Sequence, residues 1–213
     1  MTENKKKWGK WLPAVIASLV LTTFGIIGAS LVGFSYQGTA ERIAQNEREA
    51  LLKQLSIIVP QHRLDNDLLS DQITIQAPDD LGTDSTVVFR ARKQGKPVAA
   101  VFSPVIARGY SGSISLLVGV YTDGSIAGVR VITHKETPGL GDKIEAERSD
   151  WIKGFDHKSL ERPVADRWKV KRDGGDFDQF TGATITPRAI VSAVKSTLNY
   201  FSSHQDILFT LSE

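Results

Sequence analysis

The longest apolar stretch of the chain lies close to its N-terminus. Residues 12–34 contain no charged side chain. A helix of about 20 residues spans the hydrocarbon core of a bilayer. Trp8 and Trp11 flank the start of the stretch, as interfacial aromatic residues do. The pattern therefore predicts a transmembrane helix over residues 12–35, preceded by a short tail of residues 1–11.

A cleaved signal peptide is the competing interpretation of this stretch. Its apolar region is about 7–15 residues long and ends in a small-residue cleavage site. Ala29-Ser30-Leu31 is a poor cleavage site, and the apolar run continues beyond it. The length of the run therefore favours an uncleaved anchor.

Helical spacing continues beyond the apolar stretch, but with one charged face. Apolar residues recur from Ile43 to Leu55 among glutamates, arginines and lysine. Pro60 ends the pattern, because the residue before a proline is disfavoured in helical geometry. The aspartates that follow lack the ligand order of a calcium loop. Residues 36–84 are thus predicted to be a stalk helix and a connecting segment with one short strand at residues 73–75.

Two pairs of β-strands are predicted after the connecting segment. Residues 85–92 and 97–106 form one pair, joined across Gln94-Gly95-Lys96. Residues 114–121 and 126–133 form the other, and the Asp-Gly between them is a strong hairpin signal. Consecutive hairpins make an antiparallel sheet. The fold class predicted is α+β: an N-terminal transmembrane helix and an extracytoplasmic domain over residues 85–213, with an antiparallel sheet and packed helices.

Two helices are predicted to pack on this sheet. One covers residues 144–151, and the other runs from Arg188 to about Phe201, where apolar residues recur at helical intervals. The polar segment between them, residues 151–177, is expected to form a mixed surface with a basic cluster. That cluster consists of Arg167, Lys169, Lys171 and Arg172.

Composition and charge narrow the chemistry. The 213 residues carry a formal charge of +2, and residues 1–10 hold four lysines against Glu3, which leaves the remainder slightly acidic. A nucleic-acid-binding face is therefore disfavoured. Those lysines place the N-terminus in the cytoplasm by the positive-inside rule. The chain has no cysteine, which excludes thiolate catalysis and Cys-ligated metals, and its four histidines have no ligand-like spacing. No metal site is predicted.

The candidate chemistry is concentrated just before the last helix, in residues 178–187. Thr186 is the expected N-cap and Pro187 the first helical residue. The free N–H groups of a first helical turn, with the positive end of the dipole, favour an anion such as phosphate beside Thr184. Gly182 and Ala183 keep bulky side chains away from the backbone. On these residues alone, a plain helix start is the favoured explanation of the pattern.

A second small-residue loop, residues 134–142, follows the second hairpin. Pro138 and two glycines prevent a continuing strand or helix and expose the backbone. Such a loop can wrap a flat ring system, with Leu140 as an apolar contact. On these residues alone, a simple connection from the strand to the helix over residues 144–151 is the favoured explanation.

The two stretches together resemble the FMN-binding domain family. Asp178-x-x-Thr181-Gly182-Ala183-Thr184 is similar to its flavinylation motif, and residues 136–141 to its paired glycine signature. The resemblance implies that Thr184 is esterified to the phosphate of FMN and that the other motif residues are recognised by a flavin transferase using FAD and a divalent metal ion. It further implies a flavin pocket formed with Thr137, Gly139, Leu140 and Gly141.

Within that family, the sequence is most similar to G subunits of Rnf (Rsx) ion-translocating electron transport complexes. Their C-subunit relatives in sodium-translocating quinone reductases are usually longer and carry Ser where Thr181 stands. The resemblance implies a carrier of electrons between ferredoxin and NAD, without catalytic side chains of its own. Integral-membrane, flavin and iron–sulfur subunits would be its partners in a bacterial inner membrane.

Two alternatives remain open at this point. One is a non-redox scaffold subunit in which the Thr-Gly-Ala-Thr turn only starts a helix. The other is a C-type flavin subunit of a quinone reductase, which shares the cofactor but not the partner subunits.

Overall fold

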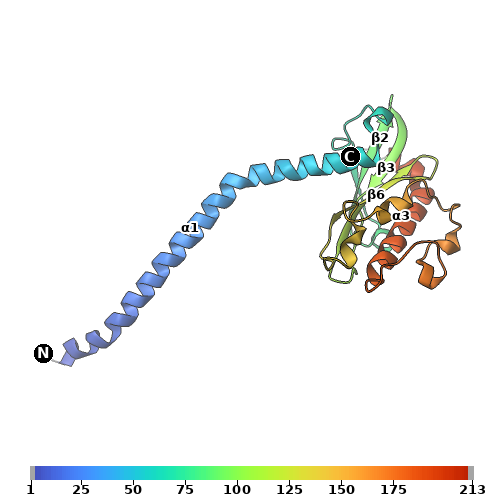
Figure 1. Cartoon of the computed structure of the whole chain (residues 1–213). Helices are drawn as coiled ribbons and strands as arrows, with labels where there is room; N and C mark the ends of the chain where they lie inside the picture. Colours follow the sequence, from blue (N-terminus) through green and yellow to red (C-terminus); the bar gives the residue numbers. More distant parts are fainter. Residues whose placement is uncertain (1–2, 211–213) are drawn as a thin grey trace. The chain divides into compact units, whose positions relative to one another are not determined.

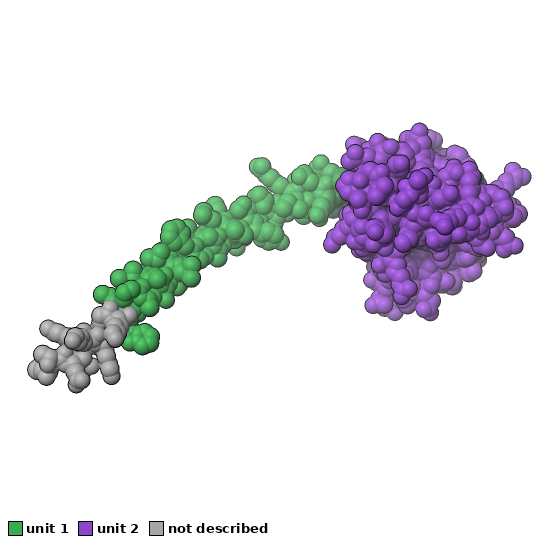
Figure 2. Space-filling model, turned by 60° about the horizontal axis from the view of Figure 1, so that its bottom comes forward, with its two compact units in different colours: residues 1–50 green, residues 51–213 purple. Residues whose placement is uncertain are grey.

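A computed structural model describes residues 3–210, with side chains from residue 11 onward. The lysines of the N-terminal tail and Trp8 therefore lie outside the described side chains. The chain divides into two compact units, with the boundary between Ala50 and Leu51 (Figure 2). The domain limits expected from the sequence, at residues 12, 36 and 85, stay a prediction.

One long helix, α1 (Glu3–Ile58), forms the first unit, and its last residues, from Leu51 onward, belong to the second unit (Figure 1). Residues 11–39 are all exposed in the chain. Among the described residues, Trp11–Ile58 is long and apolar enough to cross a membrane. This helix is consistent with a single-pass membrane anchor. It ends two residues before Pro60, as the sequence predicts.

The second unit is built on an antiparallel sheet. In the described residues it has six strands, in the order β1-β2-β3-β5-β4, with β6 also paired to β5. Their bounds are β1 Gln72–Ile75, β2 Thr86–Lys93, β3 Lys96–Phe102, β4 Val105–Ile106, β5 Ile114–Tyr121 and β6 Ile126–Thr133. The predicted α+β class is confirmed.

The hairpins follow the turn chemistry of the sequence. Gln94 and Gly95 both have positive φ, 53° and 73°, which two-residue hairpin turns of type I′ require. The strand expected over residues 97–106 is instead interrupted between β3 and β4. Pro104 lies at the break, and a proline has no N–H to donate to a neighbouring strand.

Helix α3 (Ile185–Thr210) covers one face of the sheet (Figure 1). Its apolar side chains, including Ile190, Val194 and Phe201, share a buried cluster with alternate residues of the strands. Phe102 and Phe201 meet edge to face, with ring centroids 6.3 Å apart. Alternation along the strands thus directs one set of side chains toward α3.

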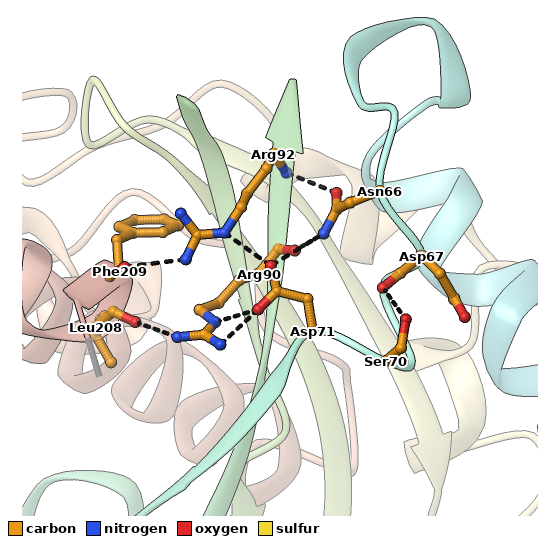
Figure 3. Close-up of polar contacts among 8 residues, drawn as sticks. All are labelled: Asn66, Asp67, Ser70, Asp71, Arg90, Arg92, Leu208 and Phe209. Atoms are coloured by element: carbon orange, nitrogen blue, oxygen red, sulfur yellow. Dashed lines mark hydrogen bonds and ion pairs between the residues drawn. The ribbon is translucent and has the colours of Figure 1, made fainter. Parts of the chain in front are cut away.

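The C-terminal end of α3 is tied to the sheet by two arginines of β2 (Figure 3). Arg90 and Arg92 donate to the carbonyl oxygens of Leu208 and Phe209, over 3.4 and 3.0 Å. Both arginines also pair with Asp71, which precedes β1. Basic side chains satisfy the last carbonyl groups of a helix and its negative dipole end. This arrangement holds α3 in place along the sheet.

The opposite face of the sheet is covered by the end of α1. Leu55, Ile58 and Val59 are buried against strand residues such as Val101 and Leu117. Two paired glycines, Gly119 of β5 and Gly128 of β6, lie under Ile58. A Cβ atom at Gly119 would come within 2.2 Å of Cγ2 of Ile58. The close approach therefore requires a residue without a side chain at position 119.

We expect Gly119→Ala to destabilise this packing. Because Ile58 is fully buried, its branched side chain cannot swing away, and overpacking of this kind costs about 1–3 kcal/mol. Gly128→Ala is the matched control, since its Cβ would lie 3.5 Å from Ile58, an ordinary contact. Thermal unfolding of the full chain in detergent measures the difference. Equal stability of the two variants would contradict the described packing.

The segment between β6 and α3 differs from the prediction. The expected helix over residues 144–151 is wrong: the chain forms short 3₁₀ turns instead. Ser149 accepts a hydrogen bond from the Trp151 amide and donates to the carbonyl of Lys143, which ends one turn and starts the next. The 3₁₀ turns of this segment are η2 Gly141–Ile144, η3 Asp150–Phe155, η4 Ala165–Arg167 and η5 Lys171–Asp173. Two other short helices precede β1 and β2, namely η1 Gln61–Arg63 and α2 Pro78–Leu81.

Aromatic packing lies beneath the mixed surface expected over residues 151–177, whose charged residues are mostly exposed. Phe155 and Phe177 stack with centroids 4.7 Å apart, and Trp168 lies 5.0 Å from Phe177. Trp151 meets Phe180 at 5.1 Å. These aromatic residues are widely spaced and separated by polar residues, so helical or strand periodicity does not reveal them. The cluster supports the chain immediately before the threonine turn.

Asp156, next to this cluster, is a source of pH-dependent stability. Burial raises the pKa of its carboxyl group, although Arg130, His157 and Lys153 act to lower it. A carboxyl group with a raised pKa in the folded state stabilises the fold below its ordinary value of 3.8, and this contribution is lost as pH rises through the folded value.

We therefore expect Asp156→Asn to stabilise the chain at pH 7.5. The gain should be about 1 kcal/mol or less, because the side chain is only half-buried, and it should shrink toward pH 4. Thermal unfolding across this pH range measures it. The exposed Asp84→Asn is the control, and a gain that grows on acidification would contradict the prediction.

Candidate functional site

The start of α3 is formed differently from the sequence expectation. The helix begins at Ile185, and the carbonyl of Thr184 accepts the first helical hydrogen bond, from the amide of Arg188 at 3.4 Å. Thr184 therefore occupies the N-cap position. The prediction that Thr186 caps the helix is wrong. Thr186 lies in the first turn, is fully buried, and donates its hydroxyl to Glu136 Oε2 at 2.5 Å.

Thr184 is half-buried at the end of a tight turn. The amide of Ala183 donates to the carbonyl of Phe180 at 3.1 Å, and Gly182 between them has φ of +83°. Thr181 and Gly182 are exposed, whereas Ala183 is buried. The amides of Ile185 and Thr186 precede the first helical hydrogen bond, so they have no intrahelical acceptor. The turn thus presents the Thr184 side chain at the positive end of a long helix.

The second predicted loop lies directly against this turn. A Cβ atom at Gly182 would stand 3.5 Å from Cδ2 of Leu140. The loop is closed on itself, since the amides of Leu140 and Gly141 both donate to the carbonyl of Thr137, at 3.1 Å. The structure therefore brings together the two stretches that the sequence singled out, although they are far apart along the chain.

The members of the loop differ in their exposure. Thr137 and Gly139 are exposed, and Gly139 has φ of +78°, which favours glycine. Leu140 is 43% exposed although it is apolar. Gly141, by contrast, is buried, and a Cβ atom there would come within 2.7 Å of Glu136 Oε2. Three of the four predicted residues are thus accessible to a ligand, while Gly141 faces the interior.

Glu136 is a residue of this site that sequence reasoning did not single out. It is only 5% exposed, and its carboxylate accepts hydrogen bonds from the amide of Ser111 at 3.1 Å and from Thr186. Its own amide donates to Nδ1 of His134, whose Nε2 lies 2.7 Å from Glu145. Glutamates are rarely buried, and a single one beside a loop carries no sequence signal of burial.

The first residue of the motif, Asp178, is held by its backbone. Its carbonyl accepts a hydrogen bond from the indole nitrogen of Trp151 at 2.8 Å. Its carboxylate is exposed and pairs with Lys171 at 2.5 Å. These partners hold Asp178 independently of Thr184, so the two ends of the motif are presented separately at the surface.

The charges around the turn are paired rather than uniformly basic. Arg188 binds Asp173 through two hydrogen bonds of 2.6 and 2.9 Å, and this lowers the pKa of Asp173 and raises that of Arg188. Arg167 forms an ion pair with Asp176, and Lys171 forms one with Asp178. Two of the four residues of the basic cluster expected from the sequence, Arg167 and Lys171, are therefore paired with neighbouring aspartates.

These features fit a ligand that carries both a phosphate and a flat apolar group. The free amides at the start of α3 suit an anion. Gly182 leaves an open approach, and two exposed apolar side chains, Leu140 and Ile185, lie close to the turn.

Comparison with known proteins first defines the class. Residues 109–199, which include both loops and most of α3, match the FMN-binding domain family. Residues 12–58, which correspond to most of α1, match the RnfG N-terminal region. The chain thus contains an FMN-binding domain, preceded by a helix that matches the N-terminal region of RnfG.

Full-length relatives then define the family more closely. The chain is 46% identical to the G subunit of the ion-translocating oxidoreductase complex of Pseudoalteromonas atlantica, over 91% of both chains. It is 43% identical to the G subunit from Vibrio cholerae, over 89% of this chain and 91% of that one, and 45% identical to the one from Pseudomonas aeruginosa, over 92% of both. The chain belongs to the family of G subunits of ion-translocating oxidoreductase complexes. The resemblance inferred from the sequence is confirmed.

Proposed function

We propose that this chain is the membrane-anchored electron-carrier subunit of an ion-translocating oxidoreductase complex, with FMN bound covalently through its phosphate to Thr184. The family supports the flavin and the complex. The observation that carries the attachment site is the position of Thr184. It is the N-cap of α3, in the turn that contacts the glycine loop through Gly182 and Leu140.

The neighbouring hydroxyl groups support Thr184 as the acceptor. Thr186 is fully buried, and its hydroxyl is engaged with Glu136. Thr181 is exposed and lies in the turn before the N-cap residue. Of the three threonines, Thr184 alone combines partial exposure with the free amides of the first helical turn, which stabilise a phosphoryl group beside its Oγ1.

The attachment is a phosphoryl transfer from FAD, carried out by a flavin transferase with a divalent metal ion. Oγ1 of Thr184 forms a bond to the phosphorus that carries riboflavin, and the phosphoanhydride bond of FAD breaks. AMP leaves, and the hydroxyl proton passes to a base of the transferase. The exposed residues Asp178, Thr181 and Gly182, with the buried Ala183, form the motif that the transferase recognises.

Bound FMN supplies the electron transfer, because its ring system accepts and releases electrons singly or in pairs. The residues of the chain bind and orient it. The amides of Ile185 and Thr186 would hold the phosphate, and Thr137, Gly139 and Leu140 would lie beside the ring. Gly141 packs closely on the side chain of Glu136 and thereby supports this loop. The covalent bond retains the cofactor on a face of the membrane where replacement is scarce.

The complex and the topology complete the proposal. The chain relays electrons within a complex that links ferredoxin and NAD to sodium or proton translocation, beside integral-membrane, flavin and iron–sulfur subunits. α1 anchors it once in the bacterial inner membrane, with the N-terminus in the cytoplasm and the domain outside. The relatives at 43–46% identity are G subunits, which favours this assignment over a C-type flavin protein of a quinone reductase.

A denaturing gel tests the proposal against the non-redox scaffold. The full chain is expressed with and without an active flavin transferase, and the boiled samples are examined for flavin fluorescence. We expect a fluorescent band only with the transferase, because the phosphoester survives denaturation. A dark band in both samples would favour the scaffold.

A further inference from the structure

A buried carboxylate joins three separate segments around the threonine turn. Glu136 lies at the start of the glycine loop, its Oε1 accepts from the amide of Ser111 in the β4–β5 loop, and its Oε2 accepts from Thr186 in α3. The three segments are far apart in the sequence, at residues 111, 136 and 186. A charged group this deeply buried is retained only when its hydrogen bonds are made.

The space for this carboxylate is created by two glycines. A Cβ atom at Gly109 would come within 2.7 Å of Oε1, and one at Gly141 within 2.7 Å of Oε2. Any side chain at either position would displace Glu136. Gly109 and Gly141 belong to different loops, so both loops are shaped around the same carboxylate.

The bond to Thr186 fixes the first turn of α3, two residues after Thr184. Hydrogen bonds from a hydroxyl to a carboxylate are among the stronger ones in proteins. This one sets the point at which the helix begins and thereby the direction of the preceding N-cap side chain. It also engages the hydroxyl of Thr186, which would otherwise be the nearest competing acceptor.

From this geometry we infer that Glu136 is a positioning residue for flavin attachment: it holds Thr184 at the helix start and withholds the hydroxyl of Thr186. The inference rests on the proposed attachment of FMN to Thr184. Glu136 acts through Thr186 and the two loops, and it touches neither reacting atom. Its substitution should therefore slow the transfer step without weakening recognition, since the Asp178 and Thr181 side chains lie at the surface.

The test follows transfer from FAD to the purified, flavin-free full chain in detergent, with a flavin transferase and Mg²⁺. In Glu136→Ala we expect kcat to fall about tenfold or more, because small misplacements of a reacting group are costly, with KM unchanged. Glu136→Gln should restore most of the rate, since its amide oxygen can accept from Ser111 and its NH₂ group can donate to Thr186. Thr186→Val, close in volume to the original side chain, should lower kcat while leaving Glu136 in place.

Peptide mass spectrometry locates the flavin in each variant. We expect flavin on Thr184 in the wild type and on Thr186 in part of the Thr184→Ala/Glu136→Ala chains. Wild-type kcat in both Glu136→Ala and Thr186→Val, or an equal loss in Glu136→Ala and Glu136→Gln, would overturn the positioning role. A wild-type chain without covalent flavin would instead refute the proposed function itself, so the two failures are distinguishable.

Discussion

We expect Thr184→Val to abolish the proposed covalent flavin and Thr184→Ser to retain part of it. Valine matches the shape of threonine but has no hydroxyl, so no phosphoester can form at this position. Serine keeps the hydroxyl and loses only a methyl group, and it is as good an N-cap residue as threonine. Flavin fluorescence of the denatured band, normalised to protein, measures both variants after coexpression with the transferase.

Comparing the two variants also separates loss of the acceptor hydroxyl from loss of helix stability. Replacing an N-cap threonine by an aliphatic residue destabilises a helix by about 1 kcal/mol. Circular dichroism should therefore show a folded Thr184→Val chain with a slightly lower melting temperature. Covalent flavin at wild-type level in this variant would show that another residue is the acceptor. Loss of flavin in Thr184→Ser as complete as in Thr184→Val would show that the hydroxyl alone does not explain the site.

Gly175→Ala is expected to cause the largest loss of stability among the substitutions considered. A Cβ atom at this position would lie 1.9 Å from the carbonyl oxygen of Lys169, and backbone atoms cannot move aside as a side chain can. The amide of Gly175 also donates to the carbonyl of Val170 at 3.0 Å. Breaking this turn displaces Phe177 from the aromatic cluster. We expect a loss of about 3 kcal/mol or more, or roughly 6–12 °C in melting temperature.

Gly154→Ala serves as the control for this prediction. Gly154 lies in a nearby 3₁₀ turn, and nothing stands within 4 Å of its Cβ position. Its substitution should change the melting temperature little. Because the Gly175 turn leads into the threonine turn, Gly175→Ala should also lower flavin loading. A Gly175→Ala chain as stable as Gly154→Ala would contradict the packing described for residues 169–177.

Local patterns in the sequence were sufficient to predict most of the fold. Strands β5 and β6 have the predicted limits, because alternation and an Asp-Gly turn act over a few residues. The end of α1 was predictable from Pro60 alone. The long apolar helix was predictable from an uninterrupted run of apolar residues. Each of these features depends on neighbours in the chain and not on the rest of the domain.

Features that depend on distant contacts were not predictable. Threonine is a common N-cap residue, but the hydroxyl of Thr186 donates to the buried Glu136, fifty residues before it in the chain. The helix begins at Ile185, before Thr186. The aromatic residues from Trp151 to Phe180 have no common period, so their cluster arises only when the short turns fold. The same limitation applies to the proposed flavin site. The motif predicted its residues, and the structure shows that Leu140 lies next to Gly182.

The most direct test of the proposed function is the mass of the peptide containing Thr184, isolated from the native membrane complex. The proposal predicts that this peptide is heavier by FMN less one water, and that fragmentation places the addition on Thr184. An unmodified peptide recovered from an intact and freshly purified complex, or the addition on a different residue, would contradict it.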